Sequence, residues 1–424
     1  QEARDYMLPS KNLLKPADCS LIAVPYKEMV LGLFYLTSIN EDLVVKPETT
    51  HAYSSMDEAV MAYRLSRVTL REVVKLLLDG AVIETTVGRI ILNQNLPKEL
   101  GYINYVLKAA DVKGLIKQAS AKIDQEEVAK LIDTLKNLGF WAVTIFGGSS
   151  FSFTDCVIHD DKEKVVQEAE GEVTEIEQNY MQGLVTIEEK RELANNVWIE
   201  TTEKLADLTW GVYPEENPVK IIIKSGGARA SREQLKQISG IKGLVYDPMG
   251  KIVELPTKSN YREGLNIFEY FTSTRGARKG LADSALKTAD AGYLTRRLVD
   301  VAHEVILKED DCGDEVGIQI TNTGIRGAKF FDRISGRYSA QDVVKNGKVL
   351  LEKNTLIDEA VIIKLKEADI SKIDVRSPIT CKTKRGLCIK CYGLDFTTNK
   401  PAQIGMPVGV VAAQSIGEPG TQLT

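Results

Sequence analysis

The sequence predicts an α+β protein built from several domains. Its first 110 residues alternate short apolar runs with turn residues, which is typical of mixed β-structure with a few helices. Two later stretches, 162–210 and 264–312, are rich in helix-forming residues, the first acidic and the second basic. Three of the six cysteines lie close together near the end of the chain. The 424 residues suffice for two to four domains of ordinary size.

The composition is that of a soluble globular protein, with 43% hydrophobic and 27% charged residues and a net charge of −5. That net charge argues against a free-standing nucleic-acid-binding protein. The longest apolar run, Met29–Leu36, is far too short to cross a bilayer, and no signal-peptide pattern follows Gln1. The cysteines do not resemble a secreted disulfide framework. We therefore expect a cytoplasmic protein without a membrane partner.

The first expected domain, residues 1–161, combines strands and helices. Its second part, 111–161, is predicted as helix, strand and loop around the apolar run 138–155. Cys19 stands in a turn where glycine would be expected, and we interpret it as a small buried residue. Cys156 and His159 are three residues apart, but no second pair of ligands is near, which argues against a metal site there.

Residues 162–216 predict two antiparallel helices with a break at 182–186. An ordinary acidic surface hairpin would have the same composition. The following segment, 217–263, is expected to open on a strand at Ile221–Lys224. A glycine-rich turn, a helix and a hairpin-like stretch complete it. Such a turn before a helix can bind a phosphate, although the sequence of a P-loop is absent.

The stretch 264–312 predicts a single helix of about 40 residues, roughly 60 Å long at 1.5 Å per residue. No heptad pattern suggests a coiled coil. Four small residues form a narrow stripe where a flat group or a backbone could approach closely: Ala282, Ala285, Ala289 and Gly292. Basic residues frame this stripe: Arg275, Arg278, Lys279, Lys287, Arg296 and Arg297. A helix that exposes basic side chains to water would show the same pattern.

A small β-rich insert with a short helix near 358–367 is expected at 313–376, followed by a candidate metal site. Cys381, Cys388 and Cys391 form a C-x6-C-x2-C cluster, and structural Zn²⁺ takes four such ligands in a tetrahedron. Nearby basic residues would offset the charge of the thiolates: Lys382, Lys384, Arg385 and Lys390. Three reduced core cysteines are the plainer alternative, but glycine and lysine are poor core material. Spacing alone leaves Cys312 and His303 as alternative fourth ligands.

The amino-acid sequences of several segments resemble those of one protein family. The run 264–302 closely resembles the bridge helix of the largest (β′) subunit of bacterial RNA polymerase. Other segments are similar to the same family: 2–4, 31–37, 83–93, the glycine-rich motif at 225–240, 330–344 and 352–360. DDCG followed by RSPxTCKTxxGxCxKCYG resembles its zinc site. The resemblance therefore implies that Cys312 is the fourth ligand, and that one structural zinc ion ties the end of the bridge helix to the Cys381 segment.

The resemblance also implies roles for residues of the long helix. In this family the bridge helix spans the active-site cleft beside the RNA–DNA hybrid. Thr288 and Ala289 would lie against the template base. Five residues would face nucleic-acid phosphates or neighbouring mobile elements: Arg278, Lys279, Lys287, Arg296 and Arg297. Residues 405–424 resemble the start of the trigger loop, in which Gln422 would contact the incoming nucleotide.

The implied activity is that of a DNA-directed RNA polymerase, a nucleotidyltransferase that transfers NMP from NTP to the RNA 3′ end. The aspartates that hold the catalytic Mg²⁺ would precede Gln1, and no D-x-D-x-D triplet occurs in this sequence. We therefore expect no catalysis by this chain alone. The implied partners are the β, α and ω subunits, sigma factor, the DNA template, nascent RNA and NTPs. Cleavage or elongation factors would dock at the hairpin, and the enzyme would be associated with the nucleoid.

The predicted organisation has seven segments. They are a pore-like mixed α/β domain (1–161), a helical-hairpin funnel at the rim of the secondary channel (162–216), a region bracing the bridge helix (217–263), the bridge helix (264–312), the β-rich insert (313–376), the zinc-binding segment (377–404) and the start of the trigger-loop helix (405–424). One alternative is a stand-alone zinc-containing nucleic-acid-binding or scaffold protein without catalytic activity. A metallohydrolase is disfavoured, because Leu307 replaces the second histidine of an H-E-x-x-H motif that would begin at His303.

Overall fold

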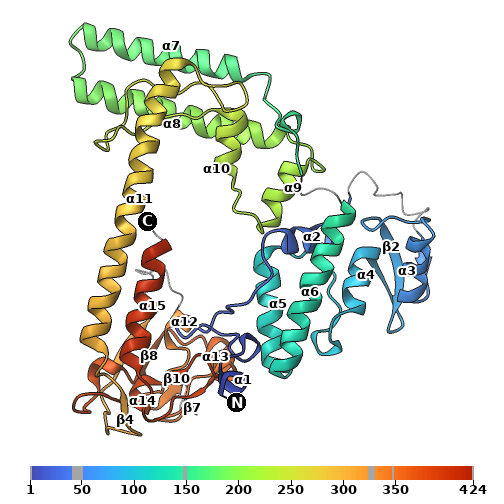
Figure 1. Cartoon of the computed structure of the whole chain (residues 1–424), viewed down its shortest axis with the longest axis vertical. Helices are drawn as coiled ribbons and strands as arrows, with labels where there is room; N and C mark the ends of the chain where they lie inside the picture. The colour runs from blue at the N-terminus through green and yellow to red at the C-terminus, as the bar shows by residue number, and fades with distance from the viewer. Residues whose placement is uncertain (1, 41–50, 147–149, 323–329, 346–347, 423–424) are drawn as a thin grey trace. The chain divides into compact units, whose positions relative to one another are not determined.

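The computed structural model describes residues 2–40, 51–146, 150–322, 330–345 and 348–422. The chain folds into two compact units. One consists of Gln1–Ile22 with Leu281–Thr424, and the other of Ala23–Gly280, so their boundary falls within the long helix α11 (Ile267–Ala302; Figure 1). The combination of helices with several small sheets confirms the predicted α+β class.

The 23–280 unit begins with five helices and one small sheet. The helices are α2 (Glu28–Thr37), α3 (Met56–Arg64), α4 (Val87–Gln94), α5 (Ala109–Lys122) and α6 (Gln125–Phe146). In the sheet, β1 (Ala52–Tyr53) is parallel to β2 (Val73–Leu78), and β2 is antiparallel to β3 (Ala81–Thr86). Helices α3 and α4 pack with this sheet around a buried apolar core that includes Leu76 and Ile90 (Figure 1).

Two glycines allow α2 and α6 to pack closely. A Cβ on Gly32 would lie 1.9 Å from the carbonyl oxygen of Gly139, and a Cβ on Gly139 would lie 2.3 Å from that of Met29. Both helices correct the sequence prediction. The apolar run 29–37, expected within mixed β-structure, is helical, and α6 replaces the strand expected in 111–161. Because seven of the ten α2 residues are buried, its sequence lacks the one-sided period that distinguishes a helix from a strand.

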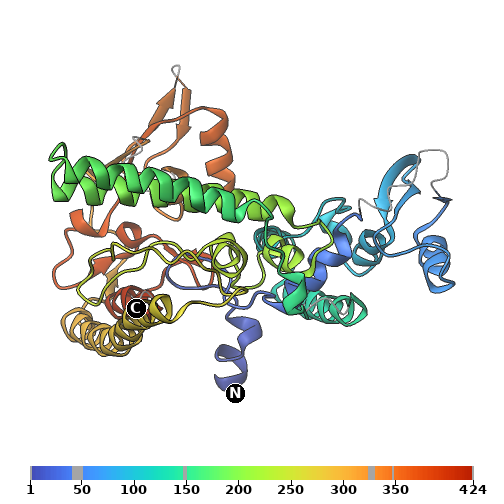
Figure 2. The ribbon, with the colours of Figure 1, turned by 90° about the horizontal axis from the view of Figure 1, so that it is seen from above.

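The predicted acidic hairpin is confirmed. Helices α7 (Lys162–Met181) and α8 (Ile187–Val212) run side by side, and the break between them falls at 182–186 (Figures 1 and 2). Helix α8 begins at Thr186, whose hydroxyl accepts the N–H of Glu189 while the Glu189 carboxylate accepts the N–H of Thr186. This reciprocal cap satisfies two backbone donors at the start of the helix. The hairpin closes on a buried core: Val165, Ala169, Trp198, Leu205 and Ile241.

The prediction of a strand at 221–224 is wrong, because this stretch lies in helix α9 (Pro218–Ser225). Asn217 caps the helix by accepting the N–H of Val219 at 2.9 Å, and proline is favoured at the first helical position. Gly226 ends it with a left-handed backbone, φ 65°. These start and stop signals outweigh the strand preference of three consecutive isoleucines.

The rest of the region before α11 is irregular. The short helix α10 (Arg232–Leu235) continues into one π-helical turn, Lys236–Gly240. The predicted hairpin-like stretch is present as two isolated antiparallel bridges, Gly243 with Thr257 and Tyr246 with Ile252.

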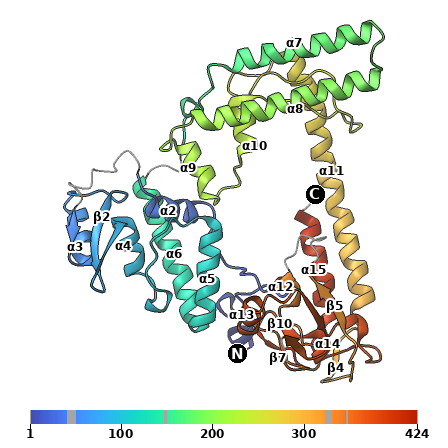
Figure 3. The same cartoon turned by 180° about the vertical axis from the view of Figure 1, so that it is seen from behind.

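Helix α11 is shorter than the expected 264–312, and its 36 residues include none that is buried. Asn266 starts it by accepting the N–H of Phe268 at 2.8 Å. In the unit that contains residues 281–424, α15 (Val408–Gln422) lies along α11 (Figures 1 and 3). The approach is close, because a Cβ on Gly409 would lie 2.0 Å from the carbonyl oxygen of Ala302 and one on Gly417 would lie 2.1 Å from Thr295 Oγ1.

Residues 313–376 contain both short strands and helices. These elements are β5 (Ile318–Thr321), α12 (Phe330–Ile334), β6 (Val343–Lys345), β7 (Lys348–Leu351), α13 (Glu359–Glu367) and β8 (Lys372–Val375). Strands β5 and β8 pair antiparallel, with Ile318 opposite Val375, and β6 pairs antiparallel with β7. Helix α13 matches the helix expected near 358–367. The insert has its own apolar core, which includes Ile334 and Ile357.

The remaining helices, strands and turns of the described residues are short. They are α1 (Glu2–Tyr6), β4 (Leu307–Glu309), β9 (Leu387–Cys388), α14 (Ile389–Tyr392), β10 (Leu394–Asp395), β11 (Lys400–Pro401) and 3₁₀ turns at Pro9–Lys11, Lys98–Leu100, Phe153–Asp155 and Pro378–Thr380. Cys19 is half-buried rather than buried, and its φ of 57° is the left-handed conformation for which glycine was expected. Within the described residues, no helix combines the length and apolarity needed to span a bilayer.

Candidate metal centre and basic helix

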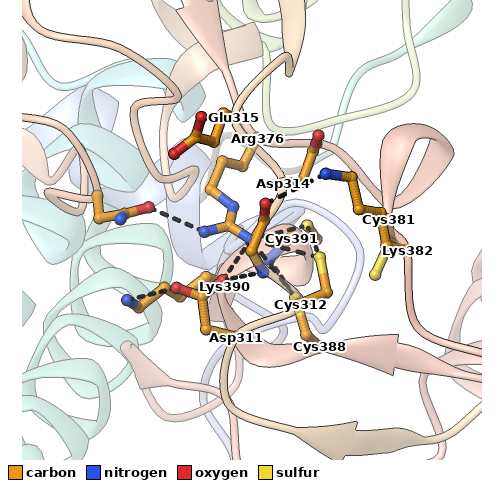
Figure 4. Close-up of polar contacts among 12 residues, drawn as sticks. Asp311, Cys312, Asp314, Glu315, Arg376, Cys381, Lys382, Cys388, Lys390 and Cys391 are labelled. Carbon is orange, nitrogen blue, oxygen red and sulfur yellow. Dashed lines mark hydrogen bonds and ion pairs between the residues drawn. The ribbon is translucent and has the colours of Figure 1, made fainter.

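The fold brings the four predicted cysteine ligands together. Strand β4 pairs in parallel with β9, which sets Glu309 beside Cys388 and so brings the loop carrying Cys312 to the C-x2-C segment. Cys388 also caps α14, and Cys391 lies inside that helix. Cys381 follows the 3₁₀ turn Pro378–Thr380, which starts at a capping serine. Figure 4 shows the cluster.

The distances suit one tetrahedral metal ion. The four sulfur atoms all lie within 4.8 Å of one another, and those of Cys312 and Cys391 are 3.6 Å apart. Four thiolates at about 2.3 Å from a zinc ion would be roughly 3.8 Å apart. The Cys391 N–H donates to Cys388 Sγ at 3.3 Å, and Cys381 Sγ lies 3.1 Å from Thr383 Oγ1. Four sulfur ligands would leave no open coordination position, so such a centre is structural.

The alternative fourth ligand does not join the cluster. His303 follows the end of α11, where its Nδ1 lies 2.8 Å from the carbonyl oxygen of Asp300. The structure therefore resolves the choice that spacing left open, in favour of Cys312.

A buried arginine that the sequence reasoning missed lies against the sulfur atoms. The Arg376 side chain is 1% exposed, and its Nη2 lies 3.5 Å from the sulfurs of Cys312 and Cys391 and 3.8 Å from that of Cys388. The same nitrogen lies 2.6 Å from Asp311 Oδ1 (Figure 4). In the sequence, Arg376 is the first residue of the RSPxTCKT segment, five residues before Cys381, but that pattern did not by itself indicate a contact with the sulfurs.

Of the basic residues expected to offset the thiolate charge, Lys390 instead pairs with Asp311 at 2.8 Å. Lys382 is exposed and donates to the carbonyl oxygen of Gly313 at 3.3 Å. Lys384 and Arg385 are also exposed. The positive charge in contact with the sulfur atoms therefore comes from Arg376.

The surroundings shift the pKa values of the thiols in different directions. Burial raises the pKa of Cys388, and it raises the pKa of Cys391 well above the usual value for a thiol. Burial also opposes ionisation of Cys312, but backbone N–H groups at Lys382 and Asp314 and the neighbouring sulfurs outweigh it and lower its pKa to about 7. Since a metal binds thiolates, loading this centre must release protons from the buried thiols.

All seven predicted site residues of the long helix are exposed: Arg278, Lys279, Lys287, Thr288, Ala289, Arg296 and Arg297. At 3.6 residues per turn, Arg278, Ala289 and Arg296 share one face with the small-residue stripe. Lys279 instead donates to the carbonyl oxygen of Pro248. The Gln422 side chain lies outside the described part of the chain, and its backbone closes α15.

Three of these helix residues make contacts along α11 itself. The Thr288 hydroxyl donates to the carbonyl oxygen of Ser284 at 2.8 Å. Arg296 lies 4.0 Å from Asp300, and Arg297 lies over the ring of Tyr293 at 5.4 Å.

Comparisons with known proteins agree on one family. The model of RNA polymerase Rpb1, domain 3, matches residues 12–156, and that of RNA polymerase Rpb1, domain 5, matches 264–424. Similar curated proteins include the DNA-directed RNA polymerase subunits beta' of Pelotomaculum thermopropionicum (43% identical), Caldicellulosiruptor saccharolyticus (44%) and Thermoanaerobacter pseudethanolicus (41%). Each match covers 100% of this chain but only 36%, 38% and 37% of the respective relative. The chain thus spans a little over a third of the length of these relatives.

Proposed function

Because the chain belongs to the family of bacterial DNA-directed RNA polymerase β′ subunits, we propose that it carries the funnel hairpin, the bridge helix and the zinc centre of such a subunit. In the intact enzyme it would take part in DNA-templated transfer of NMP from NTP to the RNA 3′ end. The observation that carries this proposal is a similarity that runs along the whole chain. A stand-alone zinc protein is not favoured for the same reason.

The exposure of α11 supports a role within an assembly. A 36-residue helix without a buried residue gains little stability from packing in its own chain. Large apolar side chains of α11 are exposed to solvent, including Ile267 at 85% and Phe268 at 82% exposure. Contiguous exposed apolar residues mark interaction surfaces. We assign them to contacts with other subunits, which in this family would be β, α, ω and sigma factor.

The basic face of α11 suits nucleic acid. Arg278 and Arg296 are five helical turns apart on one face, about 27 Å at 1.5 Å per residue. The stripe between them has only small side chains, including Ala289, so a base pair or sugar-phosphate backbone could approach closely. We propose that the two arginines bind phosphates of template DNA or nascent RNA, and that Thr288 and Ala289 lie against the template base.

The four-cysteine centre would hold one structural Zn²⁺. Bound zinc supplies a rigid crosslink between the chain just after α11 and the segment at 381–391. The catalytic Mg²⁺ would be held by residues outside this sequence, because no aspartate triplet is present. Gln422 and the rest of α15 would contribute the start of the trigger loop.

The remaining assignments follow the same family. Helices α7 and α8 would line the route by which NTPs enter and would receive cleavage or elongation factors. We propose that the segments at 1–161, 217–263 and 313–376 are respectively the pore-like domain, the region bracing the bridge helix and the β-rich insert. Binding to DNA would associate the enzyme with the nucleoid.

Replacement of both arginines in a reconstituted polymerase tests the proposal. Arg278→Ala with Arg296→Ala would be introduced into the full β′ subunit, and Lys364→Ala on α13 would serve as a control that removes one exposed positive charge elsewhere. Each lost phosphate contact should reduce the salt dependence of DNA binding by about 0.9 in the slope of log K against log salt. Elongation should slow in the double variant alone. Unchanged salt dependence and elongation in that variant would contradict the nucleic-acid assignment.

A further inference from the structure

Arg376 connects three parts of the 281–424 unit that are distant in sequence. Its Nη2 contacts the sulfurs of Cys312, Cys388 and Cys391, while its Nη1 donates to Asn354 Oδ1 at 2.9 Å. Asn354 follows β7 in the insert, and Arg376 itself follows β8 directly. The Arg376 N–H also donates to the carbonyl oxygen of Tyr338 at 2.8 Å. One side chain thus joins the insert to the cysteine cluster (Figure 4).

Its burial requires an electrostatic reason. A guanidinium that is 1% exposed loses nearly all of its hydration, and within the described residues its Nε has no hydrogen-bond partner. Asp311 supplies one negative charge at 2.6 Å, but Lys390 shares that carboxylate at 2.8 Å. Arg376, Lys390 and Asp311 together therefore carry one net positive charge, without counting the sulfur atoms.

A metal-loaded cluster supplies the missing negative charge. Four thiolates and one Zn²⁺ carry a net charge of −2, which is costly to bury without a cation close by. Nη2 of Arg376 lies at hydrogen-bond distance from three of the four sulfurs, with the fourth, on Cys381, beside Thr383. N–H donors in this outer position stabilise metal-bound ligands and hold them in orientation.

We propose that Arg376 is the outer-sphere counterion of the metal centre and makes the ordering of the 313–376 insert depend on the bound metal. The inference rests on the proposed occupancy of the four cysteines, but not on polymerase activity. When the metal leaves, the four sulfurs are no longer held together beside Arg376, which keeps Asp311 as its anionic partner. The contact that holds Asn354 and the end of β8 against the cluster then weakens, so the insert opens locally.

Three variants of the full chain test this role. Arg376→Met removes the charge and the donors, Arg376→Lys keeps the charge but loses the forked donor geometry, and Lys384→Met removes an exposed charge nearby. Zinc affinity would be measured by competition with a chromogenic chelator. We expect Arg376→Met to weaken zinc binding by roughly 10–100-fold, as outer-shell substitutions do. We expect Arg376→Lys to weaken it less and Lys384→Met to leave it unchanged.

Spectra of the cobalt-loaded chain add a readout that a merely structural role would not move. Loss of N–H donors to sulfur should shift the thiolate-to-Co²⁺ charge-transfer band in both Arg376 variants. Should Arg376→Met fail to fold, Arg376→Lys decides, and a wild-type band position would overturn the inference. So would wild-type zinc affinity in a folded Arg376→Met chain. If the unsubstituted chain bound no zinc, the proposed metal occupancy would fail instead, and the inference with it.

Limited proteolysis tests the coupling to the insert. In the unsubstituted chain, removal of zinc should speed cleavage within 313–376. In Arg376→Met at saturating zinc, the same sites should be cleaved at the metal-free rate. Cleavage at the zinc-loaded rate in that variant would show that the insert is ordered independently of Arg376.

Discussion

The close approach of α2 and α6 makes a sharp prediction at Gly139. In the substitution Gly139→Ala, the new methyl group would lie 2.3 Å from the Met29 carbonyl oxygen and 2.8 Å from its Cα, both backbone atoms of α2. No side chain can rotate away to make room, so the two helices must move apart by roughly 1 Å, since unbonded heavy atoms rest about 3.5 Å apart. Overpacking of this kind costs about 1–3 kcal/mol.

The helix preference of alanine opposes that cost. Alanine is better than glycine in a helix interior by about 1 kcal/mol. The net loss expected for Gly139→Ala is therefore up to about 2 kcal/mol. Gly114 in α5 provides the matched control, because a Cβ there has no atom within 4 Å. Gly114→Ala should thus stabilise its helix by about 1 kcal/mol.

Amide hydrogen exchange measures both changes locally, since it reports the free energy of opening of individual helices. Exchange in α2 and α6 should become faster in Gly139→Ala, whereas exchange in α5 should become slower in Gly114→Ala. Equal protection of α2 and α6 in the Gly139 variant and the unsubstituted chain would refute the packing argument. Opposite signs for the two substitutions would exclude a general effect of replacing glycine.

Three further outcomes are expected. Cys388→Ser should lower both the bound zinc and the melting temperature, and unchanged zinc content by atomic absorption would remove the four-thiolate centre. Thr186→Ala should destabilise the start of α8 by about 1 kcal/mol in hydrogen exchange, whereas Thr186→Ser should retain the cap; equal exchange in both variants would contradict its role. Burial raises the pKa of Tyr102, so its neutral form stabilises the fold fully below pH 10, and this contribution falls as pH rises through the folded-state pKa. Denaturation of Tyr102→Phe between pH 9 and 12 should show a smaller decline, and an identical decline would exclude Tyr102 as its source.

Features set by local sequence were predictable. The hairpin at 162–216 follows from an acidic helical composition with a break, and the cap at Thr186 lies within a T-x-x-E pattern. The C-x2-C spacing likewise predicts two metal ligands, because both cysteines lie on one turn of the chain. By contrast, the prediction of a strand at 221–224 was wrong. It relied on the strand preference of isoleucine, whereas the capping residues on either side of this stretch make it a helix.

Features set by contacts between distant segments were not predictable from spacing. Helix α2 is buried by α6 through glycines more than 100 residues apart in sequence, and neither glycine carries a local signal for this. Spacing could not choose between Cys312 and His303, because the parallel pairing of β4 with β9 makes that choice. The contact of Arg376 with the sulfurs was not predicted for the same reason, since only the folded insert brings this side chain to them.

The pairing of Ile318 with Val375 has a consequence for how this family can change over time. The chain enters and leaves the 313–376 insert at neighbouring points of one two-stranded ladder, next to the cysteine cluster. A module whose two ends adjoin can gain or lose residues internally while the surrounding framework keeps its geometry. Evolution can therefore alter the length of this insert while both of its ends keep their position beside the cysteines. The same attachment makes it a suitable place to introduce a foreign peptide tag.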